Sequence, residues 1–150
     1  MKKSNLQTLN QDAVVLVIQP QAAFALGQEA LARLQDGSVS DVYERRRILR
    51  KKISAFCNKF NIEHKDEILA PFREDRESEM EVVLKTNMPV PAIIKEMEQE
   101  FGPMLVGVGY GKLHAYSSSN VDMCDGPAFW DAREIINTKK EQAMQAEKQK

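Results

Sequence analysis

A strand with alternating glycines most constrains what this chain can fold into. Residues 104–116 read MLVGVGYGKLHAY, with Gly107, Gly109 and Gly111 at every second position. Alternation with a period of two indicates a β-strand, and here one face of the strand has no side chains. Either a helix packs very close to that face, which we favour, or a ligand lies flat on it. The spacing does not fit the G-x-G-x-x-G pattern that opens a helix in dinucleotide-binding proteins.

The segment MCDGPAFWDAREIIN, residues 123–137, predicts a helix that begins at Pro127. Proline is favoured at the first helical position, where its missing N–H costs nothing. Gly126 is expected in the turn, and the Asp125 carboxylate can cap free N–H groups at the start of the helix. We favour this structural role over anion binding, because an acidic side chain beside a helix start weakens anion binding unless a metal bridges the two. The aromatic residues expected to anchor this helix on the sheet are Phe129 and Trp130.

The remaining chain alternates strand and helix patterns. Residues 13–20, AVVLVIQP, form a continuous apolar run that suits a strand buried on both faces. Residues 68–84 predict two strands around a charged turn. This order of elements predicts an α/β (α+β) sandwich with a mostly antiparallel sheet covered by helices. Helices are predicted over residues 21–37, 41–60 and 91–102 and from residue 127 onward, and residues 139–150 are expected to form a frayed or solvated tail.

Length and composition favour a soluble protein with one domain over residues 1–150. The chain is 43% hydrophobic and 29% charged, with a formal net charge of −1. The charge gives no support for nucleic-acid binding, which usually requires a basic excess or a basic face. No apolar run approaches the roughly 20 residues that cross a bilayer, so no membrane association is expected.

The cysteines and histidines predict no metal site. Cys57 and Cys124 are too few for a disulfide framework, and we expect free thiols in a reducing, cytoplasmic setting. Cys57 falls on the apolar side of the helix over residues 41–60. His64 and His114 are far apart in the sequence and have no ligand-spaced partner, which argues against zinc.

One side of the helix over residues 41–60 is strongly basic. Such a run could contact phosphate groups, but it is more often a solvated helix face, and we interpret it so. Its residues are Arg45, Arg46, Arg47, Arg50, Lys51 and Lys52.

Two of these motifs together resemble the SatD family. GVGYGKLHAY followed by DGPAFWDARE matches a glycine-alternating strand and then an Asp-Gly-Pro-Ala-aromatic helix start, with Ala132 and Arg133 in the family's positions. APFREDRESEMEVVLK is a weaker match to the family's strand, turn and second strand. The resemblance implies a ferredoxin-like or palm-type sandwich, similar in layout to nucleotide cyclases and polymerase palms.

The chain departs from the pattern where active palm-type enzymes hold metal ions. The family's Gly-Asp at the end of the first strand is replaced by Gln19 and Pro20, and the hairpin turn retains only Glu79 at an acidic family position. Asp75 could stand in for a second ligand. Mg²⁺ demands near-ideal oxygen geometry, so this set makes a poor two-metal site. We therefore expect no cofactor and no cyclase or polymerase activity.

Three functions remain open. We rank first a non-catalytic, regulatory module that binds a nucleotide or a protein. The second is a metal-dependent nucleotide-processing enzyme with relocated carboxylates at Asp75, Glu77 or Glu79 and Asp125, and Mg²⁺ enters only under this alternative. The third is a structural domain that forms a homodimer or another homo-oligomer. The candidate ligand groove consists of Gly107, Gly109, Gly111, Lys112, Asp125, Gly126 and Arg133.

Overall fold

A four-stranded antiparallel sheet forms the centre of the molecule. The computed structural model describes residues 7–34, 40–75 and 78–148, and within these ranges the strands lie in the order β2-β3-β1-β4. This is the ferredoxin-like strand order, so the predicted mixed α+β sandwich is confirmed. The strands are β1 (Gln7–Pro20), β2 (Ile68–Glu74), β3 (Met80–Lys85) and β4 (Met104–Tyr116).

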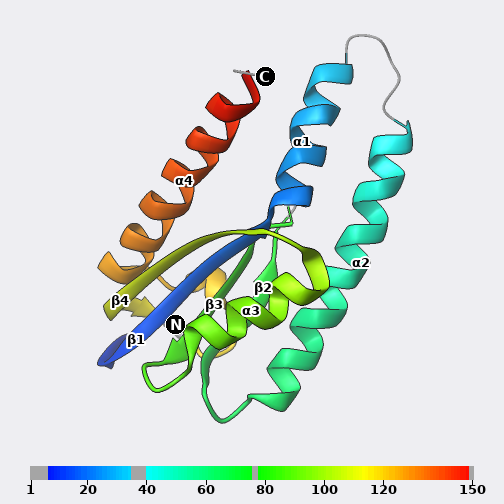
Figure 1. Cartoon of the computed structure of the whole chain (residues 1–150). Helices are drawn as coiled ribbons and strands as arrows, with labels where there is room; N and C mark the ends of the chain where they lie inside the picture. The colour runs from blue at the N-terminus through cyan, green and yellow to red at the C-terminus, as the bar shows by residue number, and fades with distance from the viewer. Residues whose placement is uncertain (1–6, 35–39, 76–77, 149–150) are drawn as a thin grey trace, which may run out of the picture.

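Helices lie on both faces of the sheet (Figure 1). Helices α2 and α3 pack on one face and α4 packs on the other, whereas α1 continues from the end of β1 and lies beside α2. The predicted end of the first helix, at residues 36–37, falls outside the described residues. Helix α4 continues to Lys148. The bounds are α1 (Gln21–Arg33), α2 (Ser40–Glu63), α3 (Val90–Phe101), α4 (Pro127–Lys148) and a short 3₁₀ turn, η1 (Val121–Met123).

The apolar run of β1 is buried on both faces, as its sequence predicted. Every residue from Ala13 to Ile18 is fully buried. Because successive side chains in a strand point to opposite faces, Val14, Leu16 and Ile18 pack under α2 and α3. The residues between them pack under α4. Within the described residues, no helix is both long enough and apolar enough to cross a membrane.

The glycine strand is explained by close packing of α4. A Cβ atom on Gly107 would lie 1.9 Å from the carbonyl oxygen of Ala132, and one on Gly109 would lie 1.9 Å from that of Ala128. Backbone therefore packs against backbone along this face of β4 (Figure 1). The packing interpretation is confirmed for these two glycines. At Gly111, by contrast, a Cβ would meet nothing within 4 Å.

Candidate functional site

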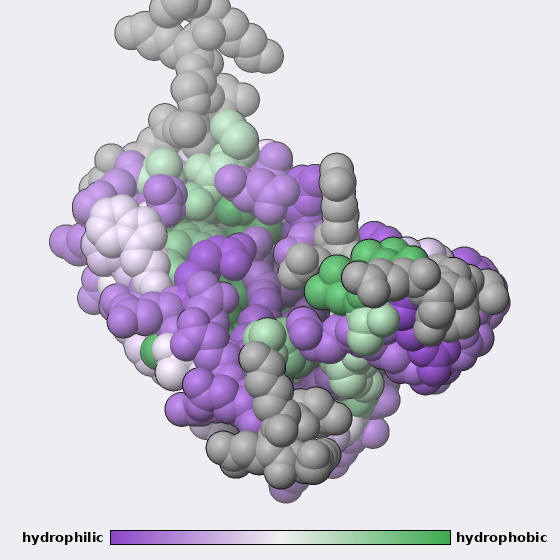
Figure 2. Space-filling model, turned by 90° about the horizontal axis from the view of Figure 1, so that it is seen from above, coloured by the Kyte–Doolittle hydropathy of each residue, from purple (hydrophilic) through white to green (hydrophobic). Residues whose placement is uncertain are grey.

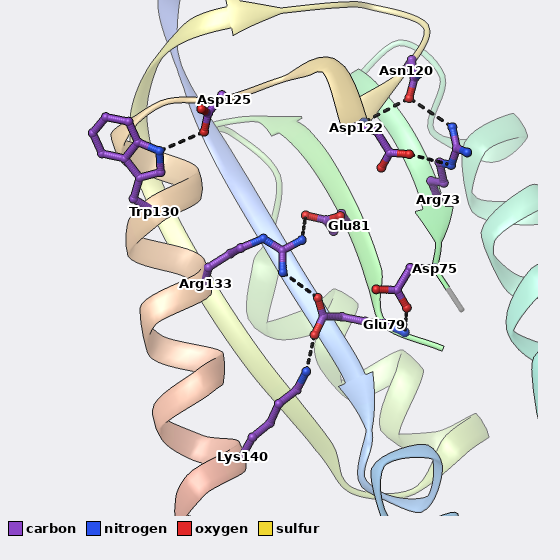
Figure 3. A network of polar contacts seen from close by, with 10 residues as sticks. All are labelled: Arg73, Asp75, Glu79, Glu81, Asn120, Asp122, Asp125, Trp130, Arg133 and Lys140. Carbon is purple, nitrogen blue, oxygen red and sulfur yellow. Dashed lines mark hydrogen bonds and ion pairs between the residues drawn. The ribbon is translucent and has the colours of Figure 1, made fainter. Parts of the chain in front are cut away.

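An ion network connects α4 to the start of β3 (Figure 3). Glu79 is buried, with 4% of its side chain exposed, and accepts hydrogen bonds from Arg133 at 2.8 Å and from Lys140. Arg133 also binds Glu81. Arg133 and Lys140 are seven residues apart, which places both on the same side of α4, toward β3. Two cations therefore face two carboxylates at this end of the sheet.

Burial and charge act against each other in this network. Burial raises the pKa of Glu81, and Glu79 raises it further, while Arg133 opposes the increase. For Arg133 itself, burial lowers the pKa, but the two carboxylates outweigh burial and the net pKa is raised. Arg133 thus stays charged and holds the carboxylates in place.

Of the carboxylates that the sequence offered as metal ligands, Glu77 lies outside the described residues, and Asp75, Glu79 and Asp125 do not converge on one point. Asp75 is exposed and accepts a hydrogen bond from the backbone N–H of Glu79 at 3.0 Å. Asp125 lies at the start of α4 and binds Trp130 there (Figure 3). Across the described ranges, no three His, Cys, Asp or Glu side chains are placed to hold a metal ion. The charge of Glu79 is matched by side chains of α4.

The predicted ligand groove is separated into three parts. Gly107 and Gly109 are buried beneath α4, and Arg133 is engaged by Glu79 and Glu81. Lys112 is exposed, and a Cβ on Gly126 would lie 3.3 Å from its carbonyl oxygen. Lys112, Asp125 and Gly126 are therefore neighbours, and Gly111 directly precedes Lys112 on β4 with open space beside it. Gly107, Gly109 and Arg133 are covered by other contacts.

The two aromatic residues of α4 have different roles. Phe129 is buried in the core and anchors the helix, as expected. Trp130 does not: its side chain is 56% exposed and its ring packs edge-on against His114, with the ring centres 6.0 Å apart. The indole N–H donates to Asp125 at 2.9 Å, and the same carboxylate oxygen accepts the Gly126 N–H. Asp125 therefore fixes the turn and Trp130.

A depression along α2 was also not predicted from the sequence. Its volume is about 650 Å³. Sequence showed the basic face of this helix, but Glu74, on β2, supplies the opposing wall and accepts a hydrogen bond from Ser54. The lining residues are Tyr43, Arg46, Arg47, Arg50, Lys51, Ser54, Ala55, Asn58 and Glu74.

A smaller depression of about 270 Å³ adjoins the first one. Arg50 and Glu74 line both of them. The smaller one is otherwise mostly acidic, and its Arg73 is held by Asp122 at 3.1 Å and by Asn120 at 3.1 Å (Figure 3). The basic surface of α2 therefore ends at the turn between β2 and β3.

Neither thiol is positioned as a nucleophile. Cys57 and Cys124 are both free and buried. Burial raises the pKa of Cys57 to about 12, and Glu74 adds to the increase. Burial also raises the pKa of Cys124. A thiolate is the reactive form, so both cysteines are structural.

The C-terminal end of α1 carries apolar surface. Leu31 and Leu34 are exposed, and a shallow groove runs from them to Tyr43 on α2. Figure 2 shows apolar surface at this end of the α1–α2 pair.

Comparison with known sequences identifies the family. The SatD family profile matches residues 31–147, which is more than half of the chain. No curated protein and no solved structure matches the chain. The match includes the glycine strand, the Asp-Gly-Pro helix start and both strands of the hairpin, the motifs on which the resemblance was based. The chain therefore belongs to the SatD family.

Proposed function

We propose that this protein is a non-catalytic module that binds a phosphate-bearing small molecule, such as a nucleotide, in the depression along α2. The observation that supports this is the set of basic and hydrogen-bonding side chains that line one side of the helix. Tyr43, Arg46, Arg50 and Ser54 recur every three or four residues, so they project from the same side. A volume of about 650 Å³ suits a nucleotide.

The cations in this depression differ in what they can offer a ligand. Arg47 is bound to Glu44 on its own helix, at 2.6 Å. Neither Arg50 nor Lys51 forms an ion pair with another residue in the described ranges. A phosphate group would therefore contact Arg50 and Lys51 first, since neither has to leave another partner. Arg50 can also present a planar fork of donors to the phosphate oxygens. The Tyr43 ring, which is partly exposed, offers a surface on which a base can stack.

From the residues at one end of the sheet, Gln19 and Glu79, we infer that the protein does not turn over its ligand. Gln19 is buried at the end of β1, and an amide cannot supply the negative charge of a metal-binding aspartate. Glu79 already neutralises Arg133 and Lys140. A site for two metal ions would need these groups to rearrange. Binding without turnover is consistent with a regulatory role.

The test is a thermal-shift series on the purified full chain, with ATP, GTP, cyclic AMP and inorganic phosphate, each with and without Mg²⁺. A ligand that binds only the folded state stabilises it by about 2.7 kcal/mol at a hundred times its Kd. We expect a nucleotide to raise the melting temperature without Mg²⁺ and to remain intact when the mixture is analysed by chromatography.

Paired variants distinguish the site from general charge effects. Arg50→Glu and Lys51→Glu should abolish the shift. Lys52→Glu is the matched control, because Lys52 is exposed on the same helix but does not line the depression. Equal losses in all three variants would indicate attraction to net charge alone and would refute the site. Mg²⁺-dependent consumption of the nucleotide would instead favour the alternative function, a metal-dependent nucleotide-processing enzyme.

A further inference from the structure

The two edges of the sheet are protected very differently. On β2, the Asn61 side chain donates to the Phe72 carbonyl at 3.2 Å and accepts the Phe72 N–H at 2.8 Å. The Tyr116 hydroxyl donates to the Leu69 carbonyl. Side chains therefore satisfy the backbone groups of Phe72 and the Leu69 carbonyl, which makes pairing of another strand with this part of β2 less favourable.

The backbone groups of β4 that face away from the sheet can be identified from the register. The Gln21 N–H donates to the Pro103 carbonyl at 2.9 Å, and this register continues without a bulge from the Pro20–Met104 pair to the Ala13–Gly111 pair. In an antiparallel pair, alternate residues bond to the partner strand, so every second residue of β4 bonds to β1. The residues whose N–H and carbonyl groups point outward are Met104, Val106, Val108 and Tyr110.

Lys139 occupies one position on this outer edge. Its ammonium donates to the Val106 carbonyl at 2.8 Å. Among the described residues, it is the one that binds an outward-facing group of residues 104–110, whereas farther along β4 the backbone of Asp125 pairs with Ala115. A lysine at a strand edge discourages uncontrolled pairing, and it can leave if an anion replaces the carbonyl. No residue in the part of the chain that the structure describes bonds to the outward N–H and carbonyl groups of Val108 and Tyr110.

Side chains on both faces form walls beside this edge. On the α3 face, Tyr110 is 63% exposed next to the half-buried Val108. On the α4 face, Ile135 is 40% exposed and lies one helical turn before Lys139. An added strand would therefore meet apolar side chains on both faces and one cation near Val106.

The position of α4 decides which kind of strand can be added. Its backbone lies directly over Gly107 and Gly109. Paired strands lie about 4.8 Å apart, whereas packed helices need about 8–10 Å between their axes. If β4 paired with β4 of a second copy in antiparallel fashion, the two α4 helices would lie on the same face and collide. A single extended segment brings no such helix.

We propose that the outer edge of β4 binds an extended peptide of a protein partner as a fifth, antiparallel strand, whose β-branched or aromatic side chains lie beside Val108 and Tyr110 and whose carboxylate takes the Lys139 ammonium from the Val106 carbonyl. Main-chain hydrogen bonds supply affinity in this mode, and alternate side chains supply specificity. The surface is separate from the depression on α2, so this inference does not depend on the proposed ligand.

The test is amide hydrogen exchange, followed by NMR on the full ¹⁵N-labelled chain. The probe is the peptide acetyl-Tyr-Thr-Val-Thr-Val-Glu-Thr-amide. Paired with residues 104–110 in antiparallel fashion, it places its glutamate on the α4 face near Lys139. In the free protein, we expect fast exchange at Val108 and Tyr110 and slow exchange at Gly107 and Gly109. Millimolar peptide should slow exchange at Val108 and Tyr110 by about tenfold.

Two variants test the geometry. Val108→Pro removes an outward N–H that β1 does not use, so it should abolish peptide binding while Gly107 and Gly109 still exchange slowly. Lys139→Glu should invert the preference between the probe and a second peptide that has lysine in place of glutamate. We expect about a threefold preference in each direction, the size typical of an exposed ion pair.

Three results would overturn the proposal. One is slow exchange at Val108 and Tyr110 in the dilute protein without peptide, because the edge would then already be covered. Another is protection that grows with protein concentration alone, because a second copy would then be the partner. The third is unchanged exchange at millimolar peptide.

Discussion

The guanidinium of Arg133 lies 2.8 Å from a carboxylate oxygen of Glu79, although the two residues are 54 positions apart in the sequence. Lys140 binds the other oxygen of the same carboxylate. This contact joins α4 to the hairpin of β2 and β3. Both oxygens of the Glu79 carboxylate are thus held by cations of α4, and this is one reason why we propose binding without turnover.

Removing Arg133 should destabilise the fold. Arg133→Ala leaves the buried Glu79 with Lys140 alone, and we expect the free energy of unfolding to fall by about 2 kcal/mol, less than for a fully buried pair because Arg133 is partly exposed. Urea denaturation measures this. Glu134→Ala, on the exposed side of the same helix, is the control and should change stability by less than about 0.5 kcal/mol. Equal effects would show that the ion network contributes nothing specific.

Stability should depend on pH through Glu81. Burial raises the pKa of Glu81 above its ordinary value of 4.5. A carboxyl group with a higher pKa in the folded state binds its proton more tightly there, so the free energy of unfolding falls as pH rises from 4.5 through the folded-state pKa. Denaturation at a series of pH values should show this decrease in the wild type. Glu81→Gln should reduce the slope, and an unchanged slope would contradict the assignment.

The glycines of β4 should not tolerate alanine. At Gly107 or Gly109, a Cβ would lie 1.9 Å from a carbonyl oxygen of α4, so we expect a loss of about 3 kcal/mol or more, because backbone cannot move aside cheaply. Gly27 is the matched control, because it lies inside α1 with nothing within 4 Å of a Cβ. Gly27→Ala should stabilise the protein by about 0.5–1 kcal/mol. If the melting temperatures of the β4 variants and of Gly27→Ala were the same, α4 would pack less closely on β4 than the structure shows.

Both thiols should be unreactive in the folded protein. Cys57 is buried with a pKa raised to about 12, and burial raises the pKa of Cys124 as well. We expect a thiol-specific disulfide reagent at pH 8 to label neither cysteine until denaturant is added, when both should react. Rapid labelling of Cys57 in the native state would mean that its helix opens readily from the sheet.

Trp130 should report on the start of α4. Asp125→Ala removes the acceptor of the indole N–H and of the Gly126 N–H. We expect an altered tryptophan emission and a stability loss of about 1 kcal/mol, typical of a lost capping interaction. Because the chain has one tryptophan, fluorescence measures this residue alone. Asp131→Ala, on the exposed face of α4, should leave the emission unchanged.

Local patterns were enough to predict most of the fold. The apolar run of β1, the glycine alternation of β4 and the apolar faces of α2 and α3 each follow from the period of their own element. The same patterns predicted that Cys57 faces the core and that close packing explains Gly107 and Gly109. Local periodicity carries this information because each element buries one face or both, whatever its partners are.

The sequence alone determined the elements and their buried faces. It also showed that Gln19 and Pro20 replace the Gly-Asp of the family pattern at the end of β1. Only the tertiary structure decided where the charges go. Glu79 contacts Arg133 and Lys140, which are 54 and 61 residues away in the sequence. Glu74, on β2, forms the wall of the depression that faces α2. Trp130 was expected in the core and lies outside it. Such contacts depend on how separate elements pack, and periodicity within one element carries no information about the charges that another element will bring to it.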